Sequence, residues 1–361
     1  MPRIVWPVAT GIALFTVAAV GTVASPAQAA TAGVASVTSA TKVQYQAASG
    51  KQNKVVITRS GNTITIDDKV AVRAGTGCKK VKGDKTKVRC TTKKAPGRVT
   101  ISTYDRYDVI VNNSDVRMSA FSGSGNDTVT GGSRGDKIQT GSGNDKADGR
   151  GGNDTLWGMT GNDTLRGGTG DDRLWGLEGK DKLYGETGAD DLNGGLGRDH
   201  LNGGADHDWL YGDDPQLGIS ADVLLGGSGS DVVSYATYTK AVVIDADGAK
   251  GDDGQAGEHD TIGADVESLF GGSGNDRITA DTGDGSLMGG RGNDTIHGGK
   301  GNDWLLGGEG KDKLYGGSGD DSLDGGDYDK HVVDLLNGGS NDAYGDHCEK
   351  AKKDTLVGCE N

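Results

Sequence analysis

Apolar side chains recur at every ninth position through most of the second half of the chain, each two residues after an aspartate. A repeat of this kind predicts a very short strand around each apolar residue, joined to the next strand by a turn. Two units, 2 × 9 = 18 residues, would complete one coil, so successive units would alternate between two faces around a thin core. The inward residues would be Val129, Ile138, Ala147, Leu156, Leu165, Leu174, Leu183, Leu192, Leu201, Leu210, Leu224, Val233, Ile278, Leu287, Ile296, Leu305, Leu314 and Leu323.

The aspartates of the repeat are candidate metal ligands. They stand at Asp127, Asp136, Asp145, Asp154, Asp163, Asp172, Asp181, Asp190, Asp199, Asp208, Asp222, Asp231, Asp276, Asp294, Asp303, Asp312 and Asp321. Coils stacked at strand spacing, about 4.8 Å, would bring carboxylates 18 residues apart to neighbouring levels, where they repel unless a cation lies between them. Calcium fits such oxygen-rich columns better than magnesium, which requires a tight octahedral shell.

Two segments, Gly298–Leu306 and Gly316–Asp324, match the pattern G-G-x-G-x-D-x-U-x, where U is large and apolar. The chain therefore resembles the RTX, or hemolysin-type, calcium-binding repeat family from about Ser122 to Asp324. The resemblance implies an all-β fold, a right-handed parallel β-roll (β-solenoid), preceded here by a small N-terminal β domain. It also implies that the sixth-position aspartates and loop carbonyls hold calcium between successive turns, roughly a dozen ions in all.

Composition alone is ambiguous. The 361 residues include 66 glycines and only 18 aromatic residues (3 Phe, 10 Tyr and 5 Trp), too few for a conventional core. Without the register, such a chain could equally be disordered. The formal net charge of −14 excludes nucleic acid as a partner of the whole chain.

Charge divides the chain at about residue 121. Residues 30–121 carry 11 Lys and 6 Arg against 6 Asp, a net charge of +11, whereas residues 122–361 carry 20 basic and 46 acidic residues, a net charge of −26. Short β-branched runs predict a small basic β domain over 30–121. This surface could bind an anionic cell-envelope polymer or polysaccharide, lie against the acidic half, or simply be solvated.

The N-terminus reads as an export signal. Residues 1–29 combine a positive start, a short apolar run and a small-x-small cleavage pattern at Ala27–Ala29, typical of a signal peptide. A transmembrane anchor is the alternative, although the apolar run is short and no second segment could span a membrane. We expect a secreted, extracellular protein with RTX blocks at 122–233 and 271–326, a bridging module at 234–270 and a C-terminal cap at 327–361.

Four cysteines form two local pairs, Cys78 with Cys90 and Cys348 with Cys359. In an exported protein these pairs predict two structural disulfides. Zinc is the rival interpretation, but no C-x-x-C motif is present and the two pairs lie far apart in the sequence.

Some positions depart from the repeat. Gly285 replaces an aspartate, so we expect the ion sites that would pair with it to be weak or empty. Asp206 replaces the fourth-position glycine, and Ala147 thins the core. Within the bridging module, a group of acids could add a calcium site or form a solvated loop. This group comprises Asp245, Asp247, Asp252 and Asp253.

The repeat points to calcium-dependent folding rather than catalysis. The six histidines are scattered without an H-E-x-x-H motif, and the G-x-S-x-G match at Gly131–Gly135 falls inside a repeat turn, not between a strand and a helix. An adhesin or envelope-binding protein is the alternative, with the basic segment or a strip of Trp157, Trp175 and Tyr211 as contact surface. An enzyme with an unrecognised active site stays open as a third hypothesis.

Overall fold

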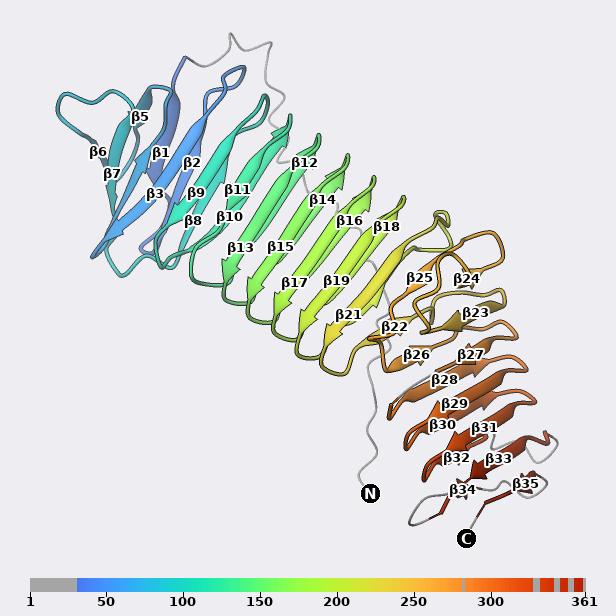
Figure 1. Ribbon diagram of the computed structural model, residues 1–361. Coiled ribbons are helices and arrows are strands. Elements are labelled where there is room, and N and C mark those ends of the chain that lie inside the picture. The colour runs from blue at the N-terminus through green and yellow to red at the C-terminus, as the bar shows by residue number, and fades with distance from the viewer. Residues whose placement is uncertain (1–30, 281–282, 327–331, 341–344, 350–353, 360–361) are drawn as a thin grey trace.

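The repeat folds as its period predicts. The computed structural model describes residues 31–280, 283–326, 332–340, 345–349 and 354–359, and strands are the only regular elements in these ranges. The described residues contain no helix long and apolar enough to cross a bilayer. The expected signal peptide lies outside the described residues. The strands stack into a parallel β-solenoid of about 14 turns, drawn from end to end in Figure 1.

Three sheets are formed by the described residues. Sheet A has the order β34 (His347–Glu349), β32 (Ser322–Asp324), β30 (Trp304–Glu309), β28 (Ser286–Arg291), β26 (Ser268–Phe270), β22 (Val232–Ser234), β20 (Trp209–Tyr211), β18 (Asp191–Leu196), β16 (Arg173–Glu178), β14 (Thr155–Thr160), β12 (Lys137–Ser142), β10 (Arg117–Ser124), β8 (Arg98–Ser102), β2 (Lys42–Gln46), β1 (Gly33–Val37) and β5 (Val72–Ala74). Sheet B has the order β25 (Thr261–Ile262), β21 (Val223–Ser228), β19 (His200–Ala205), β17 (Lys182–Thr187), β15 (Thr164–Thr169), β13 (Lys146–Gly151), β11 (Thr128–Thr130), β9 (Val109–Asn113), β3 (Lys54–Ser60), β4 (Thr63–Asp67), β7 (Lys87–Thr91) and β6 (Cys78–Lys80). Sheet C has the order β24 (Gly254–Gln255), β23 (Val242–Asp245), β27 (Arg277–Thr279), β29 (Thr295–Lys300), β31 (Lys313–Ser318), β33 (Leu335–Ser340) and β35 (Thr355–Val357).

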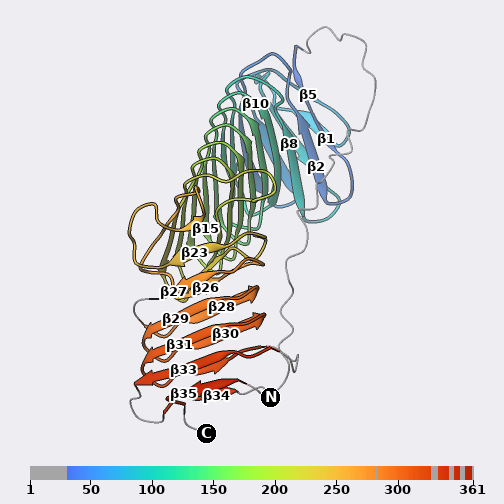
Figure 2. The ribbon, with the colours of Figure 1, turned by 90° about the vertical axis from the view of Figure 1, so that its right-hand side faces the viewer.

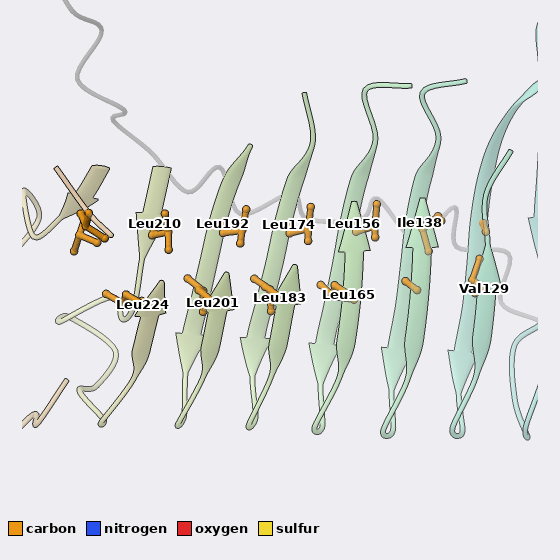
Figure 3. Close-up of a cluster of buried hydrophobic side chains, with 14 of the residues drawn as sticks. Val129, Ile138, Leu156, Leu165, Leu174, Leu183, Leu192, Leu201, Leu210 and Leu224 are labelled. Carbon is orange, nitrogen blue, oxygen red and sulfur yellow. The ribbon is translucent and has the colours of Figure 1, made fainter. Parts of the chain in front are cut away.

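The register between neighbouring coils is 18 residues in the uninterrupted repeats. On sheet A, for example, Ile138 pairs with Leu156, which pairs with Leu174. All the apolar residues predicted to face inward are buried, and Figure 3 shows those that it labels, from Val129 to Leu224, in two columns between sheets A and B. One apolar residue per strand therefore suffices, because each packs against the apolar residues of the coils above and below it.

The strands before Phe121 belong to the same sheets as the repeats. In sheet A, β2 pairs with β8, which pairs with β10, and in sheet B, β3 pairs with β9, which pairs with β11. The antiparallel strands β4, β7 and β6 extend sheet B beyond β3 at that end. The change of composition near residue 121 is thus not a break in the hydrogen-bonded sheets.

The bridging segment changes one face of the roll and preserves the other. Sheet A continues through β22, β26 and β28, whereas the opposite face passes from sheet B, which ends at β25, to sheet C. In Figure 2 the strands after this segment, coloured orange and red, lie at a clear angle to the strands before it. Tyr235 and Tyr238 are buried here and pack edge to face.

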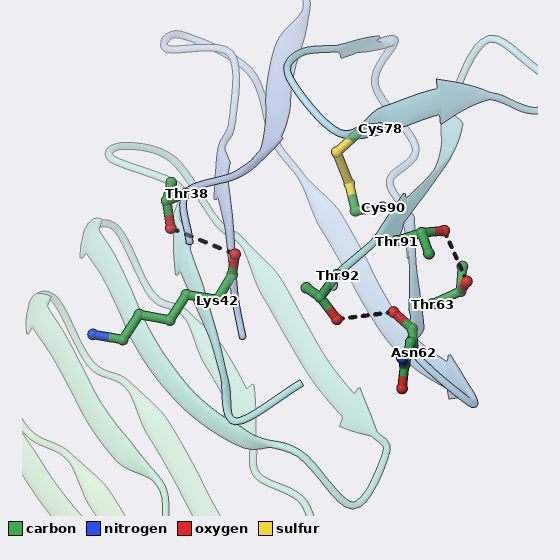
Figure 4. The surroundings of a disulfide bond; sticks show 8 residues. All are labelled: Thr38, Lys42, Asn62, Thr63, Cys78, Cys90, Thr91 and Thr92. Atoms are coloured by element: carbon green, nitrogen blue, oxygen red, sulfur yellow. Dashed lines mark hydrogen bonds between the residues drawn. A yellow bond between two sulfur atoms is a disulfide. The ribbon is translucent and has the colours of Figure 1, made fainter. Parts of the chain in front are cut away.

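Both expected disulfides are present. Cys78 on β6 is bonded to Cys90 on β7, in the antiparallel part of sheet B (Figure 4). Cys348 on β34 is bonded to Cys359 after β35, so this bond links the last described strands of sheets A and C. Each bond therefore ties together strands near one end of the solenoid.

Candidate metal centre

Every predicted aspartate is buried and belongs to one of four aspartate ladders along the solenoid. In each ladder the backbone N–H of one member donates to Oδ1 of the next member, one coil further on, over 2.5–3.2 Å. The ladders are Asp108-Asp127-Asp145-Asp163-Asp181-Asp199-Asp222-Asp260, Asp136-Asp154-Asp172-Asp190-Asp208-Asp231, Asp276-Asp294-Asp312-Asp334-Asp354 and Asp303-Asp321-Asp346.

The second carboxylate oxygen of most ladder members is buried without a hydrogen-bond partner. This holds for Oδ2 of Asp108, Asp127, Asp145, Asp154, Asp163, Asp172, Asp181, Asp190, Asp199, Asp208, Asp222, Asp231, Asp294, Asp303 and Asp321. A buried carboxylate oxygen without a donor is costly, because desolvation is not offset by any bond. Its repetition in coil after coil indicates a missing ligand rather than an isolated packing defect.

At nine of these aspartates the glycine at the first repeat position lies beside both Oδ2 and a glycine carbonyl of the next coil: Asp154, Asp163, Asp172, Asp181, Asp190, Asp199, Asp294, Asp303 and Asp321. Thr103, Ser122 and Thr140 take that position before Asp108, Asp127 and Asp145. At Gly194, a methyl group in place of hydrogen would lie 2.5 Å from Asp199 Oδ2 and 3.0 Å from Gly212 O. At Gly226 it would lie 2.5 Å from Asp231 Oδ2 and 2.6 Å from the carbonyl of Asp265. Glycine at the first repeat position therefore keeps open a cradle that contains only oxygen ligands. Such a donor set fits calcium, which binds carboxylate and carbonyl oxygens in flexible geometry.

Burial also changes the acidity of the ladders. Desolvation, with a smaller contribution from neighbouring ladder carboxylates, raises the pKa of Asp154, Asp190 and Asp199 to about 8. The pKa of Asp163 is raised to about 7 by the same causes. In the absence of a cation these four members of the folded ladders therefore hold protons near neutral pH, and a divalent cation would replace them.

Asp136, Asp260 and Asp276 differ from the ladder members with an unpartnered Oδ2. Oδ2 of Asp260 accepts the hydroxyl of Tyr235 over 2.6 Å. Oδ2 of Asp136 accepts the N–H of Gly132, and Oδ2 of Asp276 accepts the N–H of Gly272, each over 2.7 Å. In both places the coil beneath is irregular: Gly132 lies over the carbonyl of Ser114, and Gly272 lies over backbone carbonyls in the 235–238 segment. The N–H of the turn glycine thus donates to the carboxylate oxygen that has no partner in most other ladder members.

Gly285 interrupts sheet A's column of carboxylates. Its N–H still donates to Asp303 Oδ1 over 2.7 Å, but it offers no carboxylate to the coil before it. In that preceding coil, Glu267 accepts the N–H of Asp231 in place of an aspartate.

Several ladder members lie outside the nine-residue spacing and escape a search for that period. These are Asp108, Asp260, Asp334, Asp346 and Asp354. Each is nevertheless followed two residues later by an apolar residue or a half-cystine that pairs in the stack, as in Asp108-Val109-Ile110. A search for D-x-U triplets without fixed spacing would find them.

The bridging acids do not join a ladder. Asp253 is buried and accepts the N–H groups of Asp245 and Ile262, whereas Asp247 and Asp252 are exposed. Carboxylate oxygens of Asp245, Asp247 and Asp252 lie within 4.8 Å of one another.

The predicted aromatic strip is only partly continuous. Trp157 and Trp175 stack across β14 and β16 with ring centroids 5.6 Å apart, but Tyr211 stacks on Trp209 of its own strand. Asn193 occupies the register position between Trp175 and Tyr211. Because each stacked ring covers one face of its neighbour, little open ring surface is left for a sugar.

Comparison with known families agrees with this geometry. The family model of the RTX calcium-binding nonapeptide repeat matches residues 121–156, 157–192, 184–214, 218–234, 261–296, 279–314 and 297–327. The chain belongs to the RTX repeat family. No curated protein matches this RTX chain. The RTX matches leave out 235–260, the part of the chain where one face changes sheets.

Substitutions can distinguish the aspartates with an unpartnered Oδ2 from those whose Oδ2 accepts an N–H. Replacing Asp163 and Asp181 together by Asn retains Oδ1 as acceptor but removes two unpartnered oxygens. We expect the calcium concentration for half-maximal folding to rise at least roughly tenfold, with lower cooperativity, in a calcium titration followed by circular dichroism. The comparison pair is Asp136→Asn with Asp276→Asn, which breaks one N–H bond at each carboxylate but removes no unpartnered oxygen. It should leave the number of bound calcium ions unchanged, whereas the Asp163 and Asp181 pair should lower that number. An equal loss of ions in both pairs would contradict the assignment.

The raised acidities predict how the calcium-free chain responds to pH. A carboxyl group with a folded pKa above its unfolded value stabilises the fold below the unfolded pKa, near 4, and this stability is lost as pH rises through about 8. We therefore expect more β signal at pH 5 than at pH 8.5 in metal-free buffer. Asn at positions 154, 190 and 199 should flatten this profile, and a profile that rises with pH would refute the prediction.

Proposed function

We propose that this RTX chain is a secreted calcium-binding protein whose repeats fold into the β-roll when the aspartate ladders bind calcium outside the cell. The observation that carries the proposal is the series of buried, unpartnered Oδ2 atoms, most of which lie near a backbone carbonyl of the following coil. Without a cation these carboxylates repel one another in a desolvated column. With calcium bound, the column supplies the ligands that link one coil to the next.

Particular residues of the chain would hold the ions. Ladder members with an unpartnered Oδ2 supply the carboxylates, and the first-position glycines supply carbonyls and the space that a side chain would fill. Their Oδ1 atoms orient the carboxylates by accepting the N–H of the preceding coil. The amide-bonded Oδ2 atoms of Asp136 and Asp276 and the absent carboxylate at Gly285 set these positions apart. A content of roughly a dozen ions is consistent with the number of ladder steps.

The proposed site of folding follows from calcium availability and the sequence. Residues 1–29 have the pattern of a signal peptide, and two disulfides suit an oxidising compartment. Inside the cell, where free calcium is scarce, the acidic repeats would stay expanded and ready for export. Outside, calcium at about millimolar concentration would drive folding.

The proposed role is not enzymatic. RTX repeats are typically non-catalytic. The G-x-S-x-G match at Gly131–Gly135 lies in the turn between the strands β11 and β12, whereas a nucleophile elbow joins a strand to a helix.

A second candidate function is adhesion to an anionic cell-envelope polymer or polysaccharide. It is favoured by one observation, the net charge of +11 on residues 30–121 against −26 on residues 122–361. An opposite charge at one end of an elongated solenoid allows calcium binding and polymer binding to use separate surfaces.

A calcium titration tests the principal proposal. Far-ultraviolet circular dichroism of the purified chain, starting from calcium-free buffer at pH 8, should show a disordered spectrum that converts to a β spectrum as calcium is added. Excess EGTA should reverse the change, and magnesium at the same concentration should not produce it. A β spectrum that is complete without calcium and insensitive to EGTA would overturn the proposal.

A further inference from the structure

Two adjoining cavities near the N-terminal end form one basic groove. The larger, of about 570 Å³, is lined by Arg98, Arg117, Arg134 and Lys137, together with hydroxyl, amide and backbone groups. The smaller, of about 450 Å³, shares Arg117 and Arg134 and adds Arg59. We define the basic groove as these two cavities.

The strand register places three cations on neighbouring strands of sheet A. Arg98 and Arg117 pair with each other at the start of β8 and β10, and Lys137, which begins β12, pairs with Ser119, two residues after Arg117. Adjacent strands are about 4.8 Å apart, so Arg117 is one strand away from Arg98, and Lys137 lies on the next strand with an offset of two residues. Arg134, in the turn before β12, adds a cation beside this row. A row of this kind fits an extended chain that carries repeated negative charges.

Four of the five cations that line the groove have no ion-pair partner among the described residues. No ion pair found there involves Arg98, Arg117, Arg134 or Lys137. Arg98 donates instead to Met118 O and Ser119 Oγ, which fixes its guanidinium at the groove wall.

Two acids line the groove, and both are already engaged. Asp115 pairs with Arg59 through both carboxylate oxygens at 2.9 Å. Asp136 is buried and accepts N–H groups from Met118 and Gly132. The groove therefore presents a net positive surface to solvent.

We propose that this groove binds an acidic polysaccharide. The proposal rests on the second candidate function above and gives it a site. Ser133, Asn153 and Thr155 line the groove beside the cations, so hydroxyl and amide groups suited to sugar hydroxyls alternate with groups suited to carboxylate or sulfate. Neither cavity is lined by an aromatic side chain, which disfavours single-stranded nucleic acid, because its bases require stacking platforms.

The groove draws on both halves of the charge division. Arg59, Arg98 and Arg117 precede residue 121, whereas Arg134 and Lys137 belong to the first repeats. The complete groove is present only when those repeats are coiled against β10. Polysaccharide binding should therefore follow calcium-driven folding rather than precede it.

A binding experiment with the full chain in calcium tests the groove. The probe is a size-defined heparin oligosaccharide, with neutral dextran of similar length and double-stranded DNA as comparisons. We expect heparin to bind and dextran not to bind. Replacing Arg117 and Arg134 together by Gln should weaken heparin binding by at least about tenfold, because two charge-assisted contacts are lost. Lys137→Gln alone, at an exposed position, should weaken it by a smaller factor.

The matched control is Lys79→Gln with Lys80→Gln, which removes the same charge from exposed positions on β6, at the far edge of sheet B. It should change heparin affinity by less than about twofold. Circular dichroism of every sample in calcium shows whether the chain has folded. A failure of calcium-driven folding, the principal proposal, can therefore be distinguished from a failure of heparin binding. Absence of heparin binding by the folded chain, equal losses in the two double variants, or DNA binding as tight as heparin binding would each overturn the assignment.

Discussion

The structure depends on how each buried aspartate divides its two oxygens. Oδ1 accepts an N–H from the preceding coil, which fixes the carboxylate within the backbone ladder. In members such as Asp163, Asp181 and Asp199, Oδ2 has no donor and lies near a glycine carbonyl of the next coil. The first bond makes the coil spacing regular. The second oxygen makes that regular stack electrostatically unfavourable until a cation neutralises it. Fold and ligand requirement thus arise from the same side chain.

This division explains why so little apolar surface suffices. One buried side chain per strand, such as Leu174 between Leu156 and Leu192, gives each coil only a small hydrophobic contribution. Neighbouring coils share every interface, so a ligand that links them adds to stability at each step of the stack. The acidic, glycine-rich composition is then an advantage for a chain that must remain unfolded in one compartment and fold in another.

Much of the solenoid could be predicted from sequence, because nonapeptide period, inward apolar residues and ladder aspartates are all local features. The continuity of the sheets through residues 31–121 could not, since Asp108-Val109-Ile110 supplies a coil without the glycine-rich turn that marks the repeat. The special state of Asp136 and Asp276 also escapes the sequence. The repeat of Asp276 matches the consensus, and that of Asp136 departs from it at Arg134, which replaces the fourth-position glycine. Only the irregular coil beneath each one turns a glycine amide toward Oδ2. The basic groove depends on strand register between segments that a composition boundary separates.

The most direct test of the account is anomalous diffraction from crystals of the chain grown in calcium. The account predicts calcium peaks within about 2.3–2.6 Å of the unpartnered ladder oxygens, such as Asp199 Oδ2, and of the glycine carbonyl in the next coil, such as that of Gly212. Asp136 Oδ2, which already accepts the Gly132 amide, should have no such peak. An ordered roll in which Asp199 Oδ2 is bonded only to water, with no ion between the coils, would contradict the account.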